Sequence, residues 1–286
     1  MSQTVDAPVE YEVQDAVAVV RLRRPEAMNS LDRATKVALL EALRTAGEDD
    51  EVRCVVLTGS GRAFSAGQDL REHVADLRAA NAAGSGSGGA AGSAGSAGSA
   101  GFALGGTVRE HYNPIATLIA TMAKPVIASV NGVAAGAGAS FAFAADVRLV
   151  GASAGFNLAF SAIALSCDSG ASWWLPRLVG VAKAKDLLLF PRTVGAQEAL
   201  ELGLATRVVP DEELEAATTE LARTLAAGPT LAYASIRRAI AFSQSHDLEQ
   251  SLANEADLMD LTGRSQDHAG AVEAFVAKQR PTFIGR

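Results

Sequence analysis

The sequence predicts an α/β fold in which buried strands alternate with helices. Three short runs rich in β-branched residues, at 16–22, 52–58 and 126–130, have the composition of central strands. Turn signals follow these runs, and stretches with helical spacing or good helix formers lie between and after them. The connections are too long for hairpins, so crossovers of the α/β type are expected. A chain of 286 residues suffices for one large domain, or for a domain with a small appendage.

The first part of the chain predicts the order strand, helix, strand, turn, helix. Over 33–46, Val37, Leu40 and Leu43 recur at helical spacing, which directs them to the core. The second strand ends in a glycine-rich turn. This turn opens a further helix whose expected N-cap is Asp69.

A segment at 81–106 is composed almost entirely of Ala, Gly and Ser. Such a composition buries too little apolar surface to offset the entropy of ordering, so a flexible surface loop is expected. Two interpretations remain open. The segment is either a neutral insertion at a loop tip or a mobile cover over a substrate pocket.

Beyond this segment the helical and strand patterns resume. One helix is predicted to start at Tyr112 and to end before Lys124-Pro125. Another is predicted over 172–190, broken at Pro176 and resumed at Val181, with an edge strand at 204–209. Two further predictions concern side chains. Asp146 is expected to pin the start of the strand that follows the helix, and Trp173 and Trp174 are expected in the core, with an aromatic cradle for the substrate as the alternative.

Only helical patterns follow residue 209. A boundary is therefore predicted there, between a core at 1–209 and a C-terminal helical subdomain at 210–286.

Composition and charge exclude several classes of function. The net charge of -7 and the pI near 5.2 argue against nucleic-acid binding, because phosphate affinity needs basic patches. No signal peptide and no apolar run of roughly 20 residues is found, so no membrane association is expected. The two cysteines and four histidines lack metal-ligand spacing. The default is a metal-free cytoplasmic protein.

Two glycine-rich turns are the main candidates for chemistry. They lie at 66–69 and 136–138, and the second precedes a helix whose first amides have no intrahelical partner. Neither turn fits a nucleotide-binding motif. Together they predict two backbone donors converging on one oxygen, each of which can contribute roughly 10²–10³ to a rate. The alternative is that both are ordinary tight turns.

Four segments in this order resemble the crotonase, or enoyl-CoA hydratase/isomerase, superfamily. They are 24–31 (RPEAMNSL), 62–70 (RAFSAGQDL), 130–138 (VNGVAAGAG) and the tail at 274–283. The resemblance implies a spiral of repeated ββα units followed by C-terminal helices. It also implies an acyl-CoA thioester substrate, no separate cofactor because coenzyme A is part of that substrate, and homotrimers often paired into hexamers.

The resemblance also implies roles for individual residues. The backbone amides of Gln68 and Ala137 would hold the thioester oxygen, which is negative in an enolate. Coenzyme A would lie along Arg24 and the turn at Ala66, Gln68, Asp69, Leu70 and Arg71. The acyl pocket would include Asn113, Gly136, Ser140 and Phe160.

The departures from the family pattern bear on the reaction. The two glutamates of the family's hydratases fall on Ser140 and Phe160, neither of which transfers protons as an acid or base. The remaining carboxylate is Asp168, which resembles the proton-shuttling acid of enoyl-CoA isomerases. Three segments are together most similar to the ring-epoxide isomerases of phenylacetyl-CoA breakdown: 112–114 (YNP), 130–140 (VNGVAAGAGAS) and 168–170 (DSG) before 175–177 (LPR). The apolar neighbours of Asp168 predict a raised pKa, which suits a base that must also act as an acid. The alternative role for Asp168 is a helix N-cap for 169–175.

These observations predict an acyl-CoA isomerase that shifts a double bond or rearranges a ring epoxide, with Asp168 as acid and base. Three alternatives remain open: a hydratase that uses Asp168 and water, a thioester hydrolase, and an acyl-CoA-binding protein without catalysis.

Overall fold

The computed structural model describes residues 7–84 and 104–286 and confirms the α/β fold. Its larger sheet has the strand order β1-β2-β3-β5-β7-β10. The pair β1 and β2 is antiparallel and the other neighbours are parallel. The strands are β1 Val9–Gln14, β2 Val17–Leu22, β3 Cys54–Gly59, β5 Val126–Val130, β7 Val147–Gly151 and β10 Arg207–Val209.

A second sheet of three-residue strands adjoins the first and has the order β4-β6-β8-β9. Its strands are β4 Ala63–Ser65, β6 Val133–Ala135, β8 Gly155–Asn157 and β9 Thr193–Gly195. Each of β3, β5 and β7 runs in the large sheet, and the chain then adds one strand to the small sheet before a helix. The helices that complete the units are α2 Leu70–Gly84, α5 Ala137–Ala144 and α6 Ala171–Val179. The chain therefore repeats a ββα unit, as the resemblance implied.

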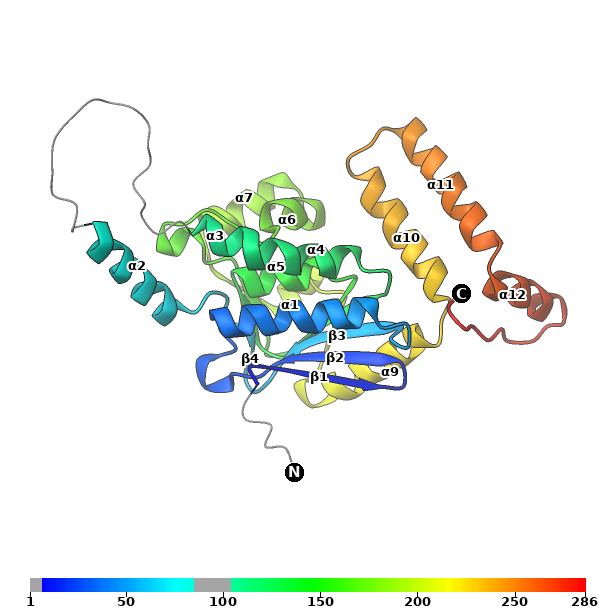
Figure 1. Cartoon of the computed structure of the whole chain (residues 1–286), viewed down its shortest axis with the longest axis horizontal. Coiled ribbons are helices and arrows are strands. Elements are labelled where there is room, and N and C mark those ends of the chain that lie inside the picture. The colour runs from blue at the N-terminus through cyan, green and yellow to red at the C-terminus, as the bar shows by residue number, and fades with distance from the viewer. Residues whose placement is uncertain (1–6, 85–103) are drawn as a thin grey trace.

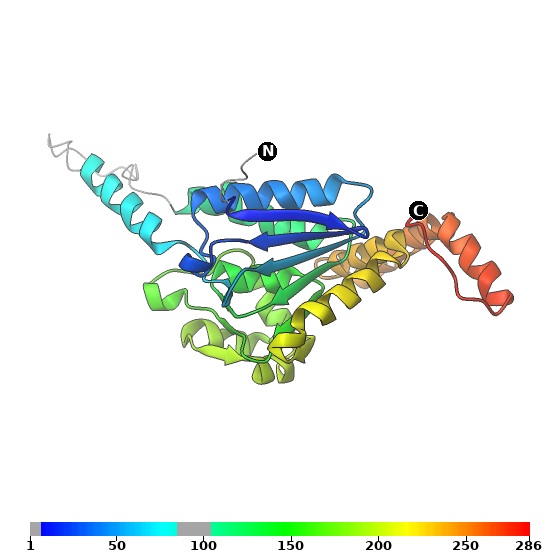
Figure 2. The same cartoon turned by 90° about the horizontal axis from the view of Figure 1, so that it is seen from below.

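Helices cover both faces of the large sheet, as Figures 1 and 2 show. On one face lie α1 Arg33–Glu48, α4 Asn113–Thr121 and α5, and on the other lies α9 Leu214–Ala226. The buried face of α1 includes Leu39, Leu40 and Leu43. Val37 was predicted to face the core, but it is 51% exposed because the helix turns it to solvent.

Two helix boundaries differ from the prediction. The helix expected from Tyr112 is preceded by two further turns, α3 Gly105–Thr107 and the π-helical η2 Val108–Tyr112, which lead directly into α4. Pro176 lies inside α6 and does not break it. The break comes at Gly180, because its φ of +78° lies outside the helical range, whereas a proline removes only one backbone hydrogen bond. The next helix is α7 Val181–Leu189.

The predicted loop at 81–106 is shorter than expected at both ends. Residues 81–84 complete α2 and Gly105 begins α3. The alanines at the start of the segment favour helix, which the compositional argument did not weigh. The rest of the prediction, at 85–103, lies outside the described residues.

The side chains of Asp146 and Trp173 can be compared with their predicted roles. Asp146 has a structural role as predicted, but it fixes a different strand: it accepts a hydrogen bond from Val126 N at 2.7 Å at the start of β5, and not at the start of β7, which follows it in the chain. Trp173 was predicted in the core, but it is 39% exposed, with the Arg177 guanidinium 3.5 Å above its ring. The stacked cation makes an exposed indole favourable at this position.

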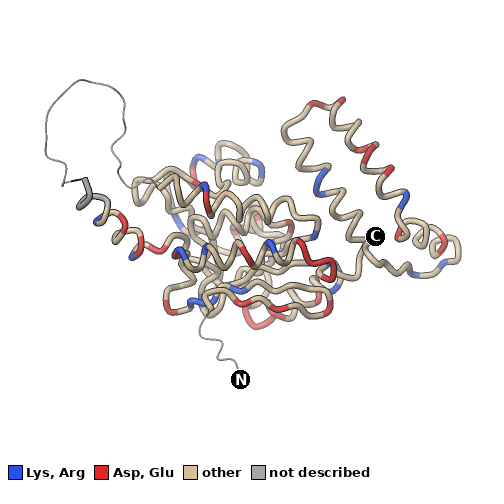
Figure 3. Tube along the Cα trace, viewed as in Figure 1, with Lys and Arg blue, Asp and Glu red and all other residues tan. Residues whose placement is uncertain are grey.

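The C-terminal helices stand to one side of the body, opposite α2 (Figure 1). Arg237 of α10 (Thr230–Ser243) ties these helices to the body by hydrogen bonds to the carbonyls of Ile119 and Lys124 and to Asp146 Oδ1, each at 2.7 Å. Figure 3 shows basic residues on α10 and mainly acidic residues on α11 (Leu248–Gly263). The remaining helices are α8 Ala196–Glu201 and α12 Gln266–Val276, with the 3-10 turns η1 Pro25–Ala27, η3 Ser161–Ile163 and η4 Asp211–Glu213. Within the described ranges, no helix combines the length and apolarity that crossing a membrane requires.

Candidate active site

The two glycine-rich turns predicted to act together are in contact. Gly67 follows β4 with φ +81°, and Gly136 follows β6 with φ +51°. A Cβ added at Gly67 would lie 2.8 Å from Ala135 O and 3.5 Å from Ala137 N. Glycine is therefore needed at Gly67 for its backbone conformation and also for the close approach of the second turn.

The amides of Gln68 and Ala137 are left without acceptors in the part of the chain that the structure describes. The bridge beside Gln68 is made by its neighbours: Leu31 N donates to Gly67 O at 2.7 Å, and Asp69 N donates to Leu31 O at 3.3 Å. Ala137 is the first residue of α5, and the N-cap glycine offers no side chain to it. Such amides are the donors that an oxyanion hole requires.

A cavity of about 470 Å³ brings most of the predicted site residues together. Asn113 lines an adjoining cavity of about 440 Å³ that also includes Gln68 and Asp168. Ser140 lines neither cavity: it is fully buried in α5 and donates to Gly136 O at 3.1 Å. The predicted residues that line the first cavity are Arg24, Ala66, Gln68, Asp69, Leu70, Arg71, Gly136, Ala137, Phe160 and Asp168.

Asp168 lies at the junction of the two cavities. Burial raises the pKa of its carboxyl above the ordinary value, although Ser169 and the charge of Lys36 oppose the shift. Ser169 Oγ donates to Asp168 Oδ1 at 2.9 Å. The N-cap role is contradicted, because Gly170 occupies the N-cap of α6 and no side chain caps that helix.

Arg24 and Asp69 are bound to each other. The Arg24 guanidinium lies 3.1 Å from Asp69 Oδ2 and 3.0 Å from Asp32 Oδ2. Asp69 accepts further hydrogen bonds from Ser30 Oγ and from the amides of Arg71 and Glu72, as expected of the N-cap of α2. Burial alone would raise the pKa of Asp69, but these bonds outweigh it and lower the pKa. The pair holds the Gln68 turn in place.

Two residues of the site were missed from the sequence. Lys36 of α1 is 3% exposed and its Nζ lies 3.3 Å from Gln68 Oε1. The Tyr112 hydroxyl donates to the same oxygen, and burial raises the pKa of Tyr112. A signal for Lys36 existed, because it stands four residues before Leu40 and seven before Leu43, on their face of the helix.

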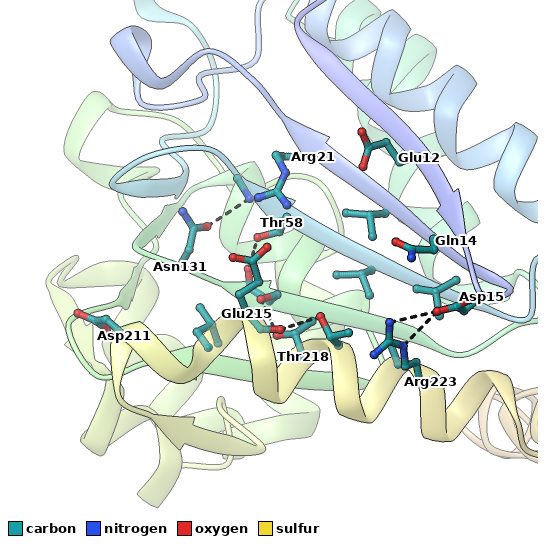
Figure 4. A pocket seen from close by; sticks show the side chains of 18 of the residues that line it. Glu12, Gln14, Asp15, Arg21, Thr58, Asn131, Asp211, Glu215, Thr218 and Arg223 are labelled. Carbon is teal, nitrogen blue, oxygen red and sulfur yellow. Dashed lines mark hydrogen bonds and ion pairs between the residues drawn. The ribbon is translucent and has the colours of Figure 1, made fainter.

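A separate cavity of about 400 Å³ lies between the large sheet and α9 (Figure 4). It contains none of the predicted residues. Arg223 pairs with Asp15 at 3.1 Å across it, and Ser129 Oγ lies 2.9 Å from Thr218 Oγ1. These contacts join α9 to the sheet.

The described residues include no group of three or more His, Cys, Asp or Glu side chains that could hold a metal ion.

Comparison with known proteins decides the family. The family model described as enoyl-CoA hydratase/isomerase matches residues 12–90 and 90–286. The chain belongs to the enoyl-CoA hydratase/isomerase family. The members of this crotonase superfamily act on acyl-CoA thioesters, so the cavity that holds the two amides is the candidate active site.

Relatives within the family carry different activities in their names. The chain is 40% identical to a protein of Rhodobacter capsulatus named "Probable enoyl-CoA hydratase", over 97% of this chain and 98% of the relative. It is 39% identical to the 1,2-epoxyphenylacetyl-CoA isomerase of Escherichia coli (strain K12), over 96% and 97%. The crystal structure of an enoyl-CoA hydratase/isomerase family protein from Mycobacterium abscessus superposes with TM-score 0.87 at 38% identity, covering 97% of this chain and 100% of that one.

Proposed function

We propose that the protein is an acyl-CoA isomerase that shifts a double bond or rearranges a ring epoxide of a CoA thioester. One observation carries the proposal: Asp168, a carboxyl with a raised pKa, shares a cavity with the unpaired amides of Gln68 and Ala137. Glu26 and Asp69 also line the cavity. Glu26 is exposed on η1 and Asp69 is committed to the pair with Arg24, so Asp168 is the remaining carboxyl among the described residues that line the cavity.

Double-bond migration needs one carboxylate and an oxyanion hole. The Asp168 carboxylate removes a proton from C2 of a 3-enoyl-CoA, and the electron pair moves into the thioester carbonyl to give a dienolate. The two amides donate to the enolate oxygen. The carboxylic acid then returns the same proton to C4, which leaves a conjugated 2-enoyl-CoA and the starting carboxylate. Nothing is oxidised or reduced.

Hydration is the second candidate because of the name carried by the Rhodobacter relative. Adding water to a double bond needs a base for the water and an acid for the α-carbon. Ser140 is buried against the Gly136 carbonyl, and Phe160 presents a ring to the cavity. One carboxyl would have to perform both tasks, which favours the isomerase.

The test uses two substrates with the purified protein. A 3-enoyl-CoA is expected to give the near-ultraviolet absorbance of a conjugated 2-enoyl-CoA, and 1,2-epoxyphenylacetyl-CoA tests the ring-epoxide reaction. Incubation of a 2-enoyl-CoA in ¹⁸O-labelled water serves as the control for hydration. Incorporation of ¹⁸O without double-bond migration would replace the isomerase by the hydratase. Tight binding of the thioesters without turnover would favour a binding protein.

A homotrimer or a dimer of trimers is part of the proposal. The support is the apolar surface on the C-terminal helices, where Ile240, Leu252 and Met259 are 57%, 55% and 71% exposed. Light scattering at several concentrations would measure the mass, and a monomer at all of them would overturn the assembly.

A further inference from the structure

Lys36 is a buried lysine in the first turns of α1, and its ammonium group meets three other segments of the chain. Nζ lies 2.9 Å from Thr107 Oγ1 on α3, 3.3 Å from Gln68 Oε1 and 3.7 Å from Glu72 Oε2 on α2. It also lies 5.4 Å from the centre of the Tyr112 ring. A buried cation costs several kcal/mol to desolvate, so an apolar side chain would fill this space at lower cost.

The Gln68 carboxamide is held at both ends. Its Oε1 accepts from Lys36 Nζ and from the Tyr112 hydroxyl, and its Nε2 donates to Asp69 O at 3.3 Å. Leu31 holds the backbone on both sides of the same residue. The peptide unit that carries the Gln68 amide therefore cannot rotate without breaking several of these bonds.

We propose that Lys36 is a positioning residue for the oxyanion hole: it fixes the Gln68 amide through the side chain and adds a buried positive charge beside the acyl cavity. The inference rests on the proposed enolate chemistry. An amide held in place before the reaction pays no reorganisation cost when the negative oxygen forms. The positive charge of Lys36 also stabilises the enolate oxygen, and it favours the ionised form of Asp168 that acts as the base.

The surroundings of Lys36 are mixed in charge. Burial lowers its pKa, while Glu72, Asp32 and Asp76 favour the charged form. Asp168 and Tyr112 lie on the acyl side. The titratable and charged groups that share the small cavity beside Lys36 are Arg33, Glu72, His73, Asp76, Glu110 and His111.

The chain offers a matched control in Lys124. This lysine is also buried, at 7% exposed, and donates to the carbonyls of Ala46 and Asp49. It lines none of the cavities of the candidate site. Lys36→Met and Lys124→Met therefore remove the same buried charge, once beside the oxyanion hole and once away from it.

The experiment measures the ionisation of bound acetoacetyl-CoA, a β-keto thioester whose enolate absorbs in the near ultraviolet. Binding to the wild type is expected to lower its enolisation pKa relative to the free thioester. Lys36→Met is expected to raise the pKa of the bound thioester by about one unit, which is the size of effect of a nearby charge, while Lys124→Met leaves it unchanged. Tyr112→Phe, which loses the hydroxyl bond to Gln68 and keeps the ring, is expected to give a smaller rise and serves if Lys36→Met does not fold.

Equal enolisation pKa values in the Lys36 and Lys124 variants, or an unchanged value in Tyr112→Phe where Lys36→Met fails to fold, would overturn the inference. The probe separates this outcome from failure of the proposed function. A wild type that ionises acetoacetyl-CoA but turns over neither substrate loses the isomerase assignment and keeps the role of Lys36. A wild type that leaves the pKa of the bound thioester at its free value refutes both.

Discussion

Two aspartates line the same cavity and have opposite environments. Asp69 accepts hydrogen bonds from Ser30, Arg71 and Glu72 and pairs with Arg24, and its pKa is lowered. Asp168 accepts one side-chain hydrogen bond, from Ser169, and its pKa is raised by burial. Both carboxylates line the cavity of the amides and desolvation raises the pKa of both, so the difference lies in how far the hydrogen-bond donors offset desolvation: they outweigh it at Asp69 and not at Asp168.

The comparison shows how a fold separates a structural carboxylate from a reactive one. A carboxylate surrounded by donors is stabilised as an anion and resists protonation, which makes it a firm anchor and a poor base. A desolvated carboxylate with few donors has a raised pKa and takes up a proton more readily. The donors of Asp69 come from the turn that presents the Gln68 amide, so its stability is also the stability of the oxyanion hole.

The largest expected effect comes from Asp168→Asn. The amide keeps the shape of the carboxyl but carries no exchangeable proton of suitable pKa, so isomerase turnover should fall by about 10³-fold. Because desolvation of the half-buried Asp168 anion is costly, the free energy of unfolding at neutral pH should stay the same or rise. Chemical denaturation and the double-bond assay measure the two quantities. Retained turnover together with lowered stability would assign Asp168 a structural role.

Asp69→Asn should show the reverse pattern, with stability as the main loss. The amide breaks the ion pair with Arg24 and places NH₂ hydrogens against other donors. Breaking this partly buried pair should cost about 2 kcal/mol of unfolding free energy. Turnover per folded molecule should fall less than in Asp168→Asn. A variant as stable as the wild type would remove Asp69 as the anchor of the turn.

Much of the fold could be predicted from strand composition. The run at 126–130 became β5 with the same limits, because a buried parallel strand is apolar throughout. The strands β4, β6 and β8 have three residues each, too few to show alternation. They were reached through the family resemblance, whose repeating unit requires a second strand.

The candidate site was predictable in its backbone and less so in its side chains. The glycines made the two turns recognisable in the sequence, because a positive φ or a close approach of another segment requires glycine at these positions. Lys36 was missed because a lysine on a helix is usually solvated, and helical spacing was counted from apolar residues alone. Arg24 was expected along coenzyme A, and its pairing with Asp69 depends on two segments that meet only in the fold.

The pH dependence of stability should differ in sign for the two aspartates. The folded-state pKa of Asp69 lies below the ordinary value of 3.8, so its stabilisation is complete above that value and is lost as the pH falls through the lowered pKa. The folded-state pKa of Asp168 lies above 3.8, so ionisation costs stability as the pH rises from 3.8 to the raised pKa. Unfolding free energies of the wild type, measured relative to each Asn variant from pH 3 upward, check both slopes. Parallel curves for the two variants would contradict the assignment.

The smallest expected effect separates the donors themselves. Ser169→Ala removes the one side-chain donor to Asp168 among the described residues, and loss of a hydrogen bond to the charged form raises a pKa. The acid limb of kcat/KM reports the pKa of Asp168, because the base must be ionised to act. This limb should therefore move to higher pH by less than about one unit, with little change in the plateau. Ser30→Ala removes one of several donors to Asp69 and serves as the control, since that carboxylate remains ionised and the limb should stay in place. If the two variants shift the limb equally, the titrating group is not Asp168, and donor number would no longer distinguish the reactive carboxylate from the structural one.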